Sequence, residues 1–418
     1  MDQQEKIGIL SDLIGFRTVG GDETQVANYL IKLFSDHGIK SQKVKYAENR
    51  DNLVVQIGNG QGPVLAFSGH QDVVAEGDLA SWDSDPFKAK ITDDRIYGRG
   101  TSDMKAGLAA MVIAIIELHE NNQALNGTLR FMATIEEEVG ELGSHQLLTE
   151  GYANDIDALI TGEPTVVPTR ELSDYFASGA ARIDPDDLAQ LTEKVKTDQT
   201  DSEQNFVFYA HKGWIMTTVT SYGKAAHSSM PGLGINAIDG IVKYYEEEKK
   251  FYAGLTATSP ILGKTIYAPT VIKGGQQVNS IPDVATLQAK IRTIPEASND
   301  WIIEQLQQII NRLNEDPKTN LKLEYDSKLP VLSDANSKLV QVIRKVTKDT
   351  IAEPLPAIPL AVSLGTDASE LSQGNDHMQI AIIGPGNNTA HQANEYVTKK
   401  MYFEIIDTYE AVAREYLK

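Results

Sequence analysis

An imidazole and a carboxylate stand two residues apart at the end of an apolar run. The run Val64–Ser68 leads through Gly69 into His70, and Asp72 follows. Because alternate side chains share one face of a strand, we expect His70 and Asp72 to project together where the strand meets its loop. Imidazole is a metal ligand, and a neighbouring carboxylate fixes its tautomer. An ordinary polar loop is the alternative interpretation.

A glycine-rich loop places another carboxylate before a helix. Gly98 and Gly100 precede Asp103, and an apolar helix is expected from Leu108. Glycines let the backbone approach a ligand closely, so Asp103 is expected at the mouth of the sheet. A simple helix cap by Asp103 is the alternative.

Two further predicted strands also end in carboxylates. Thr128–Ile135 runs into the acidic triplet Glu136–Glu138, and Asp157–Ile160 is followed by Glu163. Three adjacent carboxylates repel one another unless cations neutralise them, although a solvated acidic turn has the same pattern. In the functional interpretation, one acid reaches a metal ion and another stays free to carry protons. Because open α/β sheets place their chemistry at the carboxyl ends of strands, four such occurrences favour one shared site.

The composition limits the kind of site and of partner. The chain has 418 residues, no cysteine and a formal net charge of -20. Without thiolates, any metal must be held by histidine and carboxylate. The acidic balance makes nucleic acid and anionic membrane surfaces poor partners. The polar N-terminus lacks the features of a secretory signal, and the apolar run Leu108–Ile116 is too short to span a bilayer, so a cytoplasmic enzyme is expected.

The length of the chain and the change in its pattern of expected helices and strands predict two domains. An α/β pattern occupies 1–212 and resumes over 327–418. Within it, 166–204 is interpreted as a surface insertion with a short helix near 185–195, either a solvated loop or a lip on the substrate cleft. The intervening 213–326 has the β-α-β-β-α-β order of a ferredoxin-like unit, which marks an inserted domain.

Hydrophobic periodicity locates the individual elements. Outside the inserted domain, we expect helices over 5–16, 23–37, 337–350 and 398–416, and strands over 52–57, 63–68, 128–135, 157–160 and 379–383. Inside it, we expect strands over 214–221, 265–273, 285–293 and 321–325, and helices over 236–252 and 300–313.

Polar residues with a candidate role also occur in the second half of the chain. His227, Asn279 and Arg292 stand out within 213–326, although each taken singly also fits a structural role. Further on, the glycine turn Leu364–Ser369 offers backbone N–H groups that could hold an anion, as nests do.

Taken together, these motifs resemble those of the di-zinc amidohydrolase family, which includes acetylornithine deacetylase, succinyl-diaminopimelate desuccinylase, aminoacylase and the glutamate carboxypeptidases. The resemblance covers nearly the whole chain except 166–204, and it is carried by Ser68–Val74, Gly98–Gly107, Glu136–Glu138 and His391–Glu395. It implies a zinc-peptidase-like α/β catalytic domain with a mixed central sheet flanked by helices. It also implies an inserted ferredoxin-like α+β domain that acts as a lid and forms a homodimer.

The resemblance implies two Zn²⁺ per subunit, with Co²⁺ or Mn²⁺ as alternatives. Asp103 would bridge the two ions. His70 and Glu163 would complete the coordination of one ion. Glu138 and His391 would complete that of the other.

The resemblance also implies catalytic and substrate-binding roles. Glu137 would be the general base, and Asp72 would orient His70. His227 of the partner subunit would stabilise the oxyanion. The implied substrate-binding residues, which contact polar and carboxylate groups of the substrate, are Asn279, Arg292, Gly365 and Thr366.

The expected reaction is hydrolysis of the amide bond of an N-acyl amino acid. The first choice is N-succinyl-LL-diaminopimelate, a lysine-biosynthesis intermediate, and the alternatives are acetylornithine or a dipeptide. A catalytically inactive binding protein on the same fold is an alternative of another class, but all five implied ligands and Glu137 are present. Relatives often have Asp in place of Glu136 and an acid in place of Lys290. Ser369 stands where desuccinylases usually carry Arg, which weakens the substrate expectation more than the hydrolase expectation.

Overall fold

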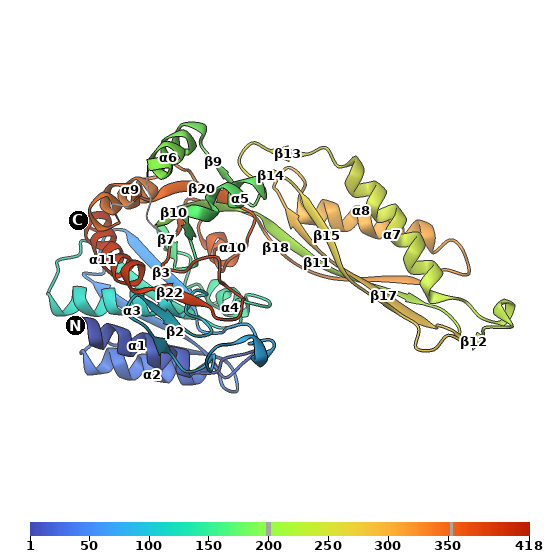
Figure 1. Ribbon diagram of the computed structural model, residues 1–418, viewed down its shortest axis with the longest axis horizontal. Helices are drawn as coiled ribbons and strands as arrows, with labels where there is room; N and C mark the ends of the chain where they lie inside the picture. The colour runs from blue at the N-terminus through green and yellow to red at the C-terminus, as the bar shows by residue number, and fades with distance from the viewer. Residues whose placement is uncertain (198–201, 352–353) are drawn as a thin grey trace. The chain divides into compact units, whose positions relative to one another are not determined.

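The structure, a computed structural model, describes residues 1–197, 202–351 and 354–418 (Figure 1). The chain divides into two compact units. Unit 1 comprises Met1–Ala210, Val331–Val362 and Thr366–Lys418. Unit 2 comprises His211–Pro330 and Ser363–Gly365. The boundaries of unit 2 therefore fall a few residues outside the expected 213–326, and a short piece of the later chain joins it.

Unit 1 combines helices with many short strands. Its helices are α1 (Gln3–Gly15), α2 (Thr24–Asp36), α3 (Lys105–Glu120), α4 (Leu142–Thr149), α5 (Leu172–Ala177), α6 (Pro185–Thr197), α9 (Lys338–Thr350), α10 (Ala368–Leu371) and α11 (Lys399–Tyr416). Its strands are β1 (Ser41–Ala47), β2 (Arg50–Gly58), β3 (Val64–His70), β4 (Lys90–Ile91), β5 (Arg95–Tyr97), β6 (Thr128–Thr134), β7 (Ala158–Thr161), β8 (Val166–Pro168), β9 (Ala181–Ile183), β10 (Glu203–His211), β19 (Val331–Leu332), β20 (Ile358–Val362), β21 (Gln379–Ile382) and β22 (Tyr396–Thr398).

One 11-stranded mixed sheet organises unit 1. Its order is β1-β2-β6-β3-β7-β21-β10-β20-β9, and β8 and β19 also pair with β10. The central strands β6, β3, β7 and β21 run parallel to their neighbours within this group. β2 and β10 join this group in antiparallel pairing. The mixed central sheet expected from the sequence is thus present.

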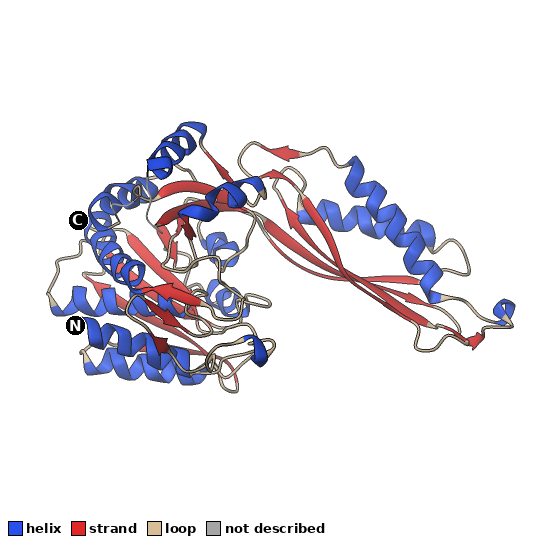
Figure 2. Cartoon of the chain, viewed as in Figure 1, coloured by secondary structure: helices blue, strands red, loops and turns tan. Residues whose placement is uncertain are grey.

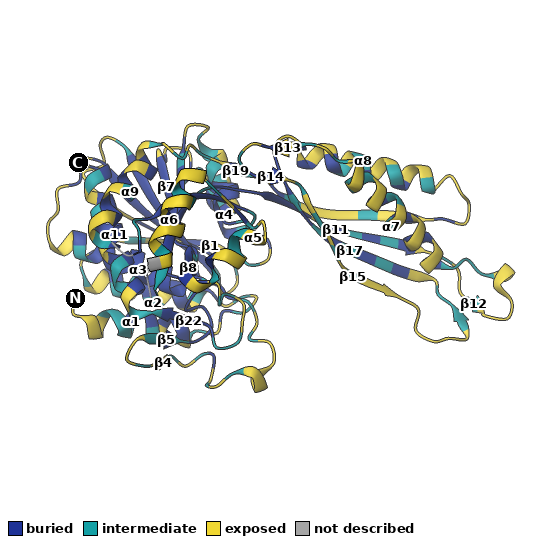
Figure 3. Ribbon diagram, turned by 45° about the horizontal axis from the view of Figure 1, so that its top comes forward, coloured by how far each residue is buried: buried dark blue, intermediate teal, exposed yellow. Residues whose placement is uncertain are grey.

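The parallel strands are buried on both faces because helices cover both sides of the sheet. Along β3, Leu65 and Phe67 join a core built with α1, α2, α3, α9 and α11. The alternate residues Val64 and Ala66 join a second core on the side of α4 and α10. Figure 3 shows these strands as the buried centre of the unit. The buried α3 is not long and apolar enough to cross a membrane, and neither is any other described helix.

The interpretation of 166–204 as a surface insertion is wrong in part. Val166 and Val167 are buried in β8, which pairs with β10, and β9 pairs with β20 at the end of the sheet. The expected short helix is present as α6, and residues 198–201 lie outside the described chain. The strand β10 that follows was not predicted. It lies between β21 and β20, and most of its residues are buried. Strand pairing satisfies the backbone N–H and C=O groups of these segments, which therefore belong to the sheet.

Unit 2 is a four-stranded antiparallel sheet with two long helices (Figure 2). In chain order it contains β11 (Gly213–Tyr222), β12 (Ala226–His227), α7 (Ala237–Gly254), β13 (Thr258–Ser259), β14 (Gly263–Lys264), β15 (Ile266–Gly274), β16 (Ser280–Ile281), β17 (Val284–Thr293), α8 (Asn299–Leu313) and β18 (Leu321–Lys328). The long strands lie in the order β15-β17-β11-β18. This is the β-α-β-β-α-β arrangement read from the sequence.

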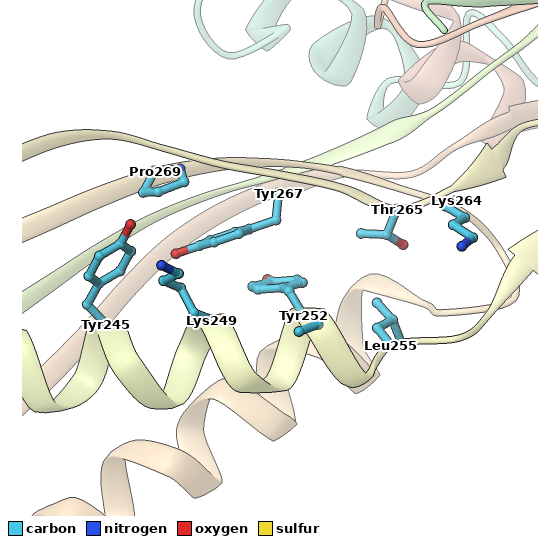
Figure 4. A pocket seen from close by; sticks show the side chains of 9 residues that line it. Tyr245, Lys249, Tyr252, Leu255, Lys264, Thr265, Tyr267 and Pro269 are labelled. Atoms are coloured by element: carbon cyan, nitrogen blue, oxygen red, sulfur yellow. The ribbon is translucent and has the colours of Figure 1, made fainter.

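A cluster of tyrosines around a buried acid joins α7 to β15. Figure 4 shows two of them, Tyr252 and Tyr267. Tyr252 stacks on Tyr267 with 4.1 Å between ring centroids. The hydroxyls of Tyr267 and Tyr244 donate to the Glu248 carboxyl at 2.7 and 3.1 Å. Burial raises the pKa of Glu248 to about 7. An open cavity of about 490 Å³ lies beside the stack, with Lys249 in its lining.

Candidate metal and catalytic site

The ends of three neighbouring strands bring most of the predicted metal ligands together. β3 lies between β6 and β7 and runs parallel to both, with His70 opposite Thr134. The chain beyond each strand therefore leaves the sheet at the same edge. That edge carries His70 at the end of β3, Glu136–Glu138 after β6, and Glu163 after β7.

The carboxylate of Asp103 lies between two imidazoles. Its Oδ1 is 3.0 Å from Nε2 of His70, and its Oδ2 is 3.2 Å from Nε2 of His391. The residue at the N-cap of α3 is Met104, without a side-chain cap, so the helix-cap interpretation of Asp103 is wrong. A carboxylate that presents its two oxygens to two histidines can bridge two metal ions.

Two further carboxylates each approach one of these imidazoles. Glu163 Oε2 lies 3.7 Å from Nε2 of His70, and Glu138 Oε2 lies 3.0 Å from Nε2 of His391. Among the residues that the structure describes, two sets of candidate ligands each have their ligand atoms within 4.8 Å of one another. One set is His70, Glu137 and Glu163, and the other is His70, Asp103 and Glu138. The five predicted metal ligands therefore form one continuous cluster in unit 1.

The three acids after β6 have three different surroundings. Glu136 pairs with Arg50, and Glu138 faces His391. Glu137 has no ion pair or side-chain hydrogen bond among the interactions of the described residues. Glu136 has a φ of 54°, in the left-handed region that non-glycine residues rarely adopt. The turn at Glu136 separates the three neighbouring side chains, so that one of them is unpaired.

Asp72 holds both His70 and the acidic turn. Nδ1 of His70 is 2.9 Å from the backbone oxygen of Asp72 and 3.5 Å from its carboxylate. The same carboxylate accepts the backbone N–H groups of Glu137 and Glu138 at 3.1 and 3.2 Å. These contacts leave Nε2 of His70 for Asp103, as a metal-ligand orientation requires.

The site concentrates negative charge in a buried place. Burial raises the pKa of Glu163 to about 8, and burial together with the charge of Glu163 raises the pKa of Glu137 above its usual value. Hydrogen bonds with its two carboxylate partners raise the pKa of His391 to about 10. Burial opposes a charged imidazole at His70, but Glu163 and Asp103 raise its pKa. Burial opposes a charged Asp103, but hydrogen bonds with the two imidazoles hold its pKa low.

The donor set fits divalent metal ions. Oε1 of Glu138 and Oε1 of Glu163 are buried and accept no hydrogen bond. Within the described residues, the ion pairs of Asp103, Glu138 and Glu163 involve imidazoles and no lysine or arginine. Buried carboxylate oxygens without donors need a cation, and histidine with carboxylate is a donor set that zinc accepts.

The predicted site residues of unit 2, the catalytic His227 and the substrate-binding Asn279, Arg292 and Gly365, lie in two pairs. The short strands β12 and β16 pair next to His227, and Ser228 N–H donates to the backbone oxygen of Asn279 at 3.0 Å. Arg292 lies opposite Trp214 in the β11–β17 ladder. A Cβ atom on Gly365 would lie 3.5 Å from Nη1 of Arg292.

These two pairs lie at opposite ends of the unit 2 sheet. The ladder that begins at Arg292 and Trp214 continues to Val284 and Tyr222. At about 3.4 Å per residue, this stretch alone spans about 27 Å. His227 follows Tyr222 in the chain, beyond that end. Within one subunit, His227 and Arg292 therefore do not meet.

The rest of the glycine turn leads into helix α10, which begins at Ala368. Thr366 is buried in unit 1, and its hydroxyl accepts the N–H of Ala368 at 3.2 Å. Ser369, which departs from the family pattern, is also buried, and its hydroxyl donates to the Glu141 carboxylate. Gly365 has no positive φ, so the structure does not give the turn the left-handed glycine that many nests use.

Two acids beside the site were missed in the sequence. Asp367 accepts a hydrogen bond from the Thr134 hydroxyl at 2.5 Å, and its charge contributes to the raised pKa of Glu137. Glu395 accepts three backbone hydrogen bonds from the loop that carries Asp103. Glu395 stands in the His391–Glu395 motif, but no local pattern indicates its partners, which lie far away in the sequence.

The comparisons with known proteins agree with this site. Residues 66–415 match the profile of peptidase family M20/M25/M40. Two curated relatives are similar over the full chain. One is a probable succinyl-diaminopimelate desuccinylase of Staphylococcus aureus, 37% identical with 100% of this chain and 98% of the relative covered. The other has the same name in Staphylococcus epidermidis, 34% identical with 100% and 99% covered.

Solved structures show the same fold. An M20 family metallo-carboxypeptidase from Sulfolobus solfataricus superimposes with a TM-score of 0.77 at 19% identity, with 100% of this chain and 99% of that chain covered. A dinuclear metal binding peptidase of the M20 family from Bacillus subtilis superimposes with a TM-score of 0.66 at 13% identity, with 99% and 98% covered. Since the profile and the full-length relatives agree, the chain belongs to peptidase family M20/M25/M40 and is a hydrolytic enzyme.

Proposed function

We propose that the protein is a di-zinc amidohydrolase that converts N-succinyl-LL-diaminopimelate and water to succinate and LL-diaminopimelate. The choice of substrate rests on one observation. The full-length relatives, at 34 to 37% identity, share the name probable succinyl-diaminopimelate desuccinylase. The clustered histidines and carboxylates support the hydrolytic chemistry. Structural neighbours at 13 to 19% identity support the fold alone.

The proposed metal ligands follow from the two imidazoles on either side of Asp103. His70, Asp103 and Glu163 would hold one Zn²⁺. His391, Asp103 and Glu138 would hold the other. Bound zinc lowers the pKa of water and polarises a carbonyl group, and Co²⁺ or Mn²⁺ can supply the same chemistry.

Glu137 is the proposed general base. Glu136 forms an ion pair with Arg50, and Glu138 forms one with His391. The described residues give the Glu137 carboxylate no such partner. It would take a proton from the attacking water while the new C–O bond forms, and deliver that proton to the amine nitrogen as the C–N bond breaks. With that one proton the amine leaves neutral, and the second proton of the water stays on the new carboxylic acid until it passes to the amine, which gives succinate and an ammonium group. Asp72 holds the backbone of Glu137 in place through the N–H at 3.1 Å.

The residues of unit 2 are proposed to bind the substrate. Arg292 suits a substrate carboxylate because a guanidinium can form two parallel hydrogen bonds with it, and Gly365 leaves room beside it. His227 and Asn279 lie at the other end of the unit 2 sheet. We therefore assign His227 to the active site of the partner subunit in a homodimer, where it would stabilise the oxyanion.

The proposal is tested by turnover of N-succinyl-LL-diaminopimelate by the Zn²⁺-loaded protein. N-acetylornithine and a dipeptide are run in parallel, and a chelator-treated sample is the control. We expect chelator-sensitive release of succinate with the highest kcat/KM of the three. If another substrate is cleaved and the succinyl compound is not, the substrate proposal is wrong. If the loaded protein cleaves none of them, the catalytic proposal is contradicted as well.

A further inference from the structure

The loops that carry Asp103 and His391 are joined by a short strand pair. β5 precedes the Asp103 loop, and β22 follows the His391 loop. The two strands are antiparallel, with Tyr97 opposite Tyr396. The next residue on each side continues this contact, because the N–H of Gly98 donates to the backbone oxygen of Glu395 at 3.0 Å. Glu395 is thereby placed at the base of the Asp103 loop.

The Glu395 carboxylate accepts backbone hydrogen bonds along that loop. Oε2 accepts the N–H of Gly100 at 3.0 Å. Oε1 accepts the N–H groups of Ser102 at 2.7 Å and of Asp103 at 3.0 Å. The residue is fully buried, so water does not compete for these bonds. One side chain therefore orders the backbone up to and including the bridging residue.

This loop needs such an external support. Gly100 has a φ of 86°, a conformation that glycine adopts freely, and that freedom must be lost on folding. Three converging N–H groups offset the loss by replacing hydrogen bonds to water with hydrogen bonds to a charged acceptor.

Arg99 links Glu395 to the His391 loop. Its Nη1 lies 2.5 Å from Oε2 of Glu395 and donates to the backbone oxygen of Gln392, next to His391, at 3.3 Å. Its Nη2 donates to the backbone oxygen of Ala75 at 3.2 Å. The arginine is only 2% exposed, so this ion pair is not screened by solvent.

We infer that Glu395 is a positioning residue, which fixes the backbone of Asp103 relative to that of His391 so that the Asp103 carboxylate faces both imidazoles at once. The inference rests on the proposed metal site and is independent of the substrate. In the described residues, the side-chain contacts of Glu395 are with Arg99 and with the backbone of Gly100, Ser102 and Asp103, and not with the proposed ligand atoms. Its effect is through the backbone of Asp103 and, with Arg99, through the backbone next to His391.

The test is the Zn²⁺ affinity of Glu395→Gln, measured by competition with a chelating dye. The amide NH₂ of Gln must replace one carboxylate oxygen and so would face either N–H donors or Arg99. We expect Zn²⁺ affinity to fall about 10- to 100-fold, as for other residues that orient metal ligands. We also expect faster hydrogen exchange of the 98–103 amides in the metal-free protein, and lower kcat with little change in KM.

The matched control is Glu248→Gln, which neutralises an equally buried carboxyl in unit 2. It should leave Zn²⁺ affinity unchanged. Glu395→Asp retains the charge with a shorter side chain, and it provides the same readouts if the Gln variant does not fold, with a smaller loss. The inference is overturned if affinity and exchange are unchanged in the Glu395 variants, or if both Gln variants lose affinity equally. The Zn²⁺ affinity and the amide exchange involve no acyl substrate, so failure of the substrate proposal is seen separately.

Discussion

At the residue scale, the acidic turn shows how three identical side chains acquire different chemistry. Glu136 pairs with Arg50, and Glu138 with His391. Burial and the charge of Glu163 raise the pKa of Glu137, and the charge of His70 opposes them only in part. An unpaired carboxylate in a buried, negative environment is a better proton acceptor than one held by a cation, because its pKa is raised.

Glu137→Gln should therefore abolish most turnover while the protein keeps its bound metal. We expect kcat to fall about 100- to 10,000-fold, the usual contribution of a general base. Steady-state kinetics and metal analysis by mass spectrometry measure the two effects. Glu136→Gln is the neighbouring control and should retain activity within a few fold. A Glu137→Gln protein that lost Zn²⁺ would identify Glu137 as a ligand instead.

At the element scale, parallel strands place like charges at one edge of the sheet. β3, β6 and β7 end together. Within the described part of the chain, the ion pairs of Glu138 and Glu163, which follow β6 and β7, are with imidazoles alone. Cations at that edge would relieve the repulsion and bind the folded state alone, which stabilises it by mass action.

Removing the metal should accordingly lower the thermal stability of the protein. At a free Zn²⁺ concentration about 1,000 times Kd, binding contributes about 4 kcal/mol, so a chelator should lower Tm by several degrees. Differential scanning calorimetry with and without chelator measures this shift. Re-addition of Zn²⁺ should restore Tm. An unchanged Tm would contradict a metal site formed by these strand ends.

Unit 2 contains a pH-sensitive contact between α7 and β15. The pKa of Glu248 is raised by burial to about 7 from an ordinary value near 4.5, so between these two pH values the folded state binds the proton and the unfolded state does not. Stability from this group is therefore full below about pH 4.5 and declines as pH rises to about 7.

Glu248→Gln should remove this pH dependence, because Gln stays neutral. We expect the variant to unfold at higher urea concentration than the parent at pH 8, and with little difference at pH 4.5. Urea unfolding followed by tryptophan fluorescence at both pH values gives the two midpoints. A parent protein equally sensitive to urea at both pH values, relative to the variant, would show that Glu248 is not protonated in the folded state.

At the scale of the whole molecule, the two pairs of predicted site residues in unit 2 cannot act together within one subunit. Arg292 and His227 lie at opposite ends of one sheet. A homodimer resolves this separation if each subunit supplies His227 to its partner's site.

Mixing inactive His227→Ala and Glu137→Ala subunits should therefore regenerate activity. The mixed dimer contains one complete site, formed by Glu137 of one subunit and His227 of the partner subunit. With random exchange, recovery should reach about a quarter of the activity of the parent dimer. Native mass spectrometry verifies that mixed dimers form. Mixed dimers without activity would contradict the assignment of His227 to the partner's site.

Elements with strong local patterns could be predicted from the amino-acid sequence. Continuous apolar runs predict β3 and the buried middle of α3, and helical periodicity predicts the amphipathic α9. Each pattern follows from how much of the element is buried. The recurrence of acids after apolar strands also predicted which residues would meet, since neighbouring parallel strands end at one edge. That prediction needed no knowledge of the distances.

Contacts between segments that are distant in the sequence are set by the tertiary packing. β10 is a central strand because β21 and β20 lie on either side of it, and β8 and β9 belong to the sheet for the same reason. Glu395 orders the Asp103 loop through backbone N–H groups, which every residue except proline has. Because such partners carry no side-chain signature, neither the strand order nor the role of Glu395 could be determined from local sequence.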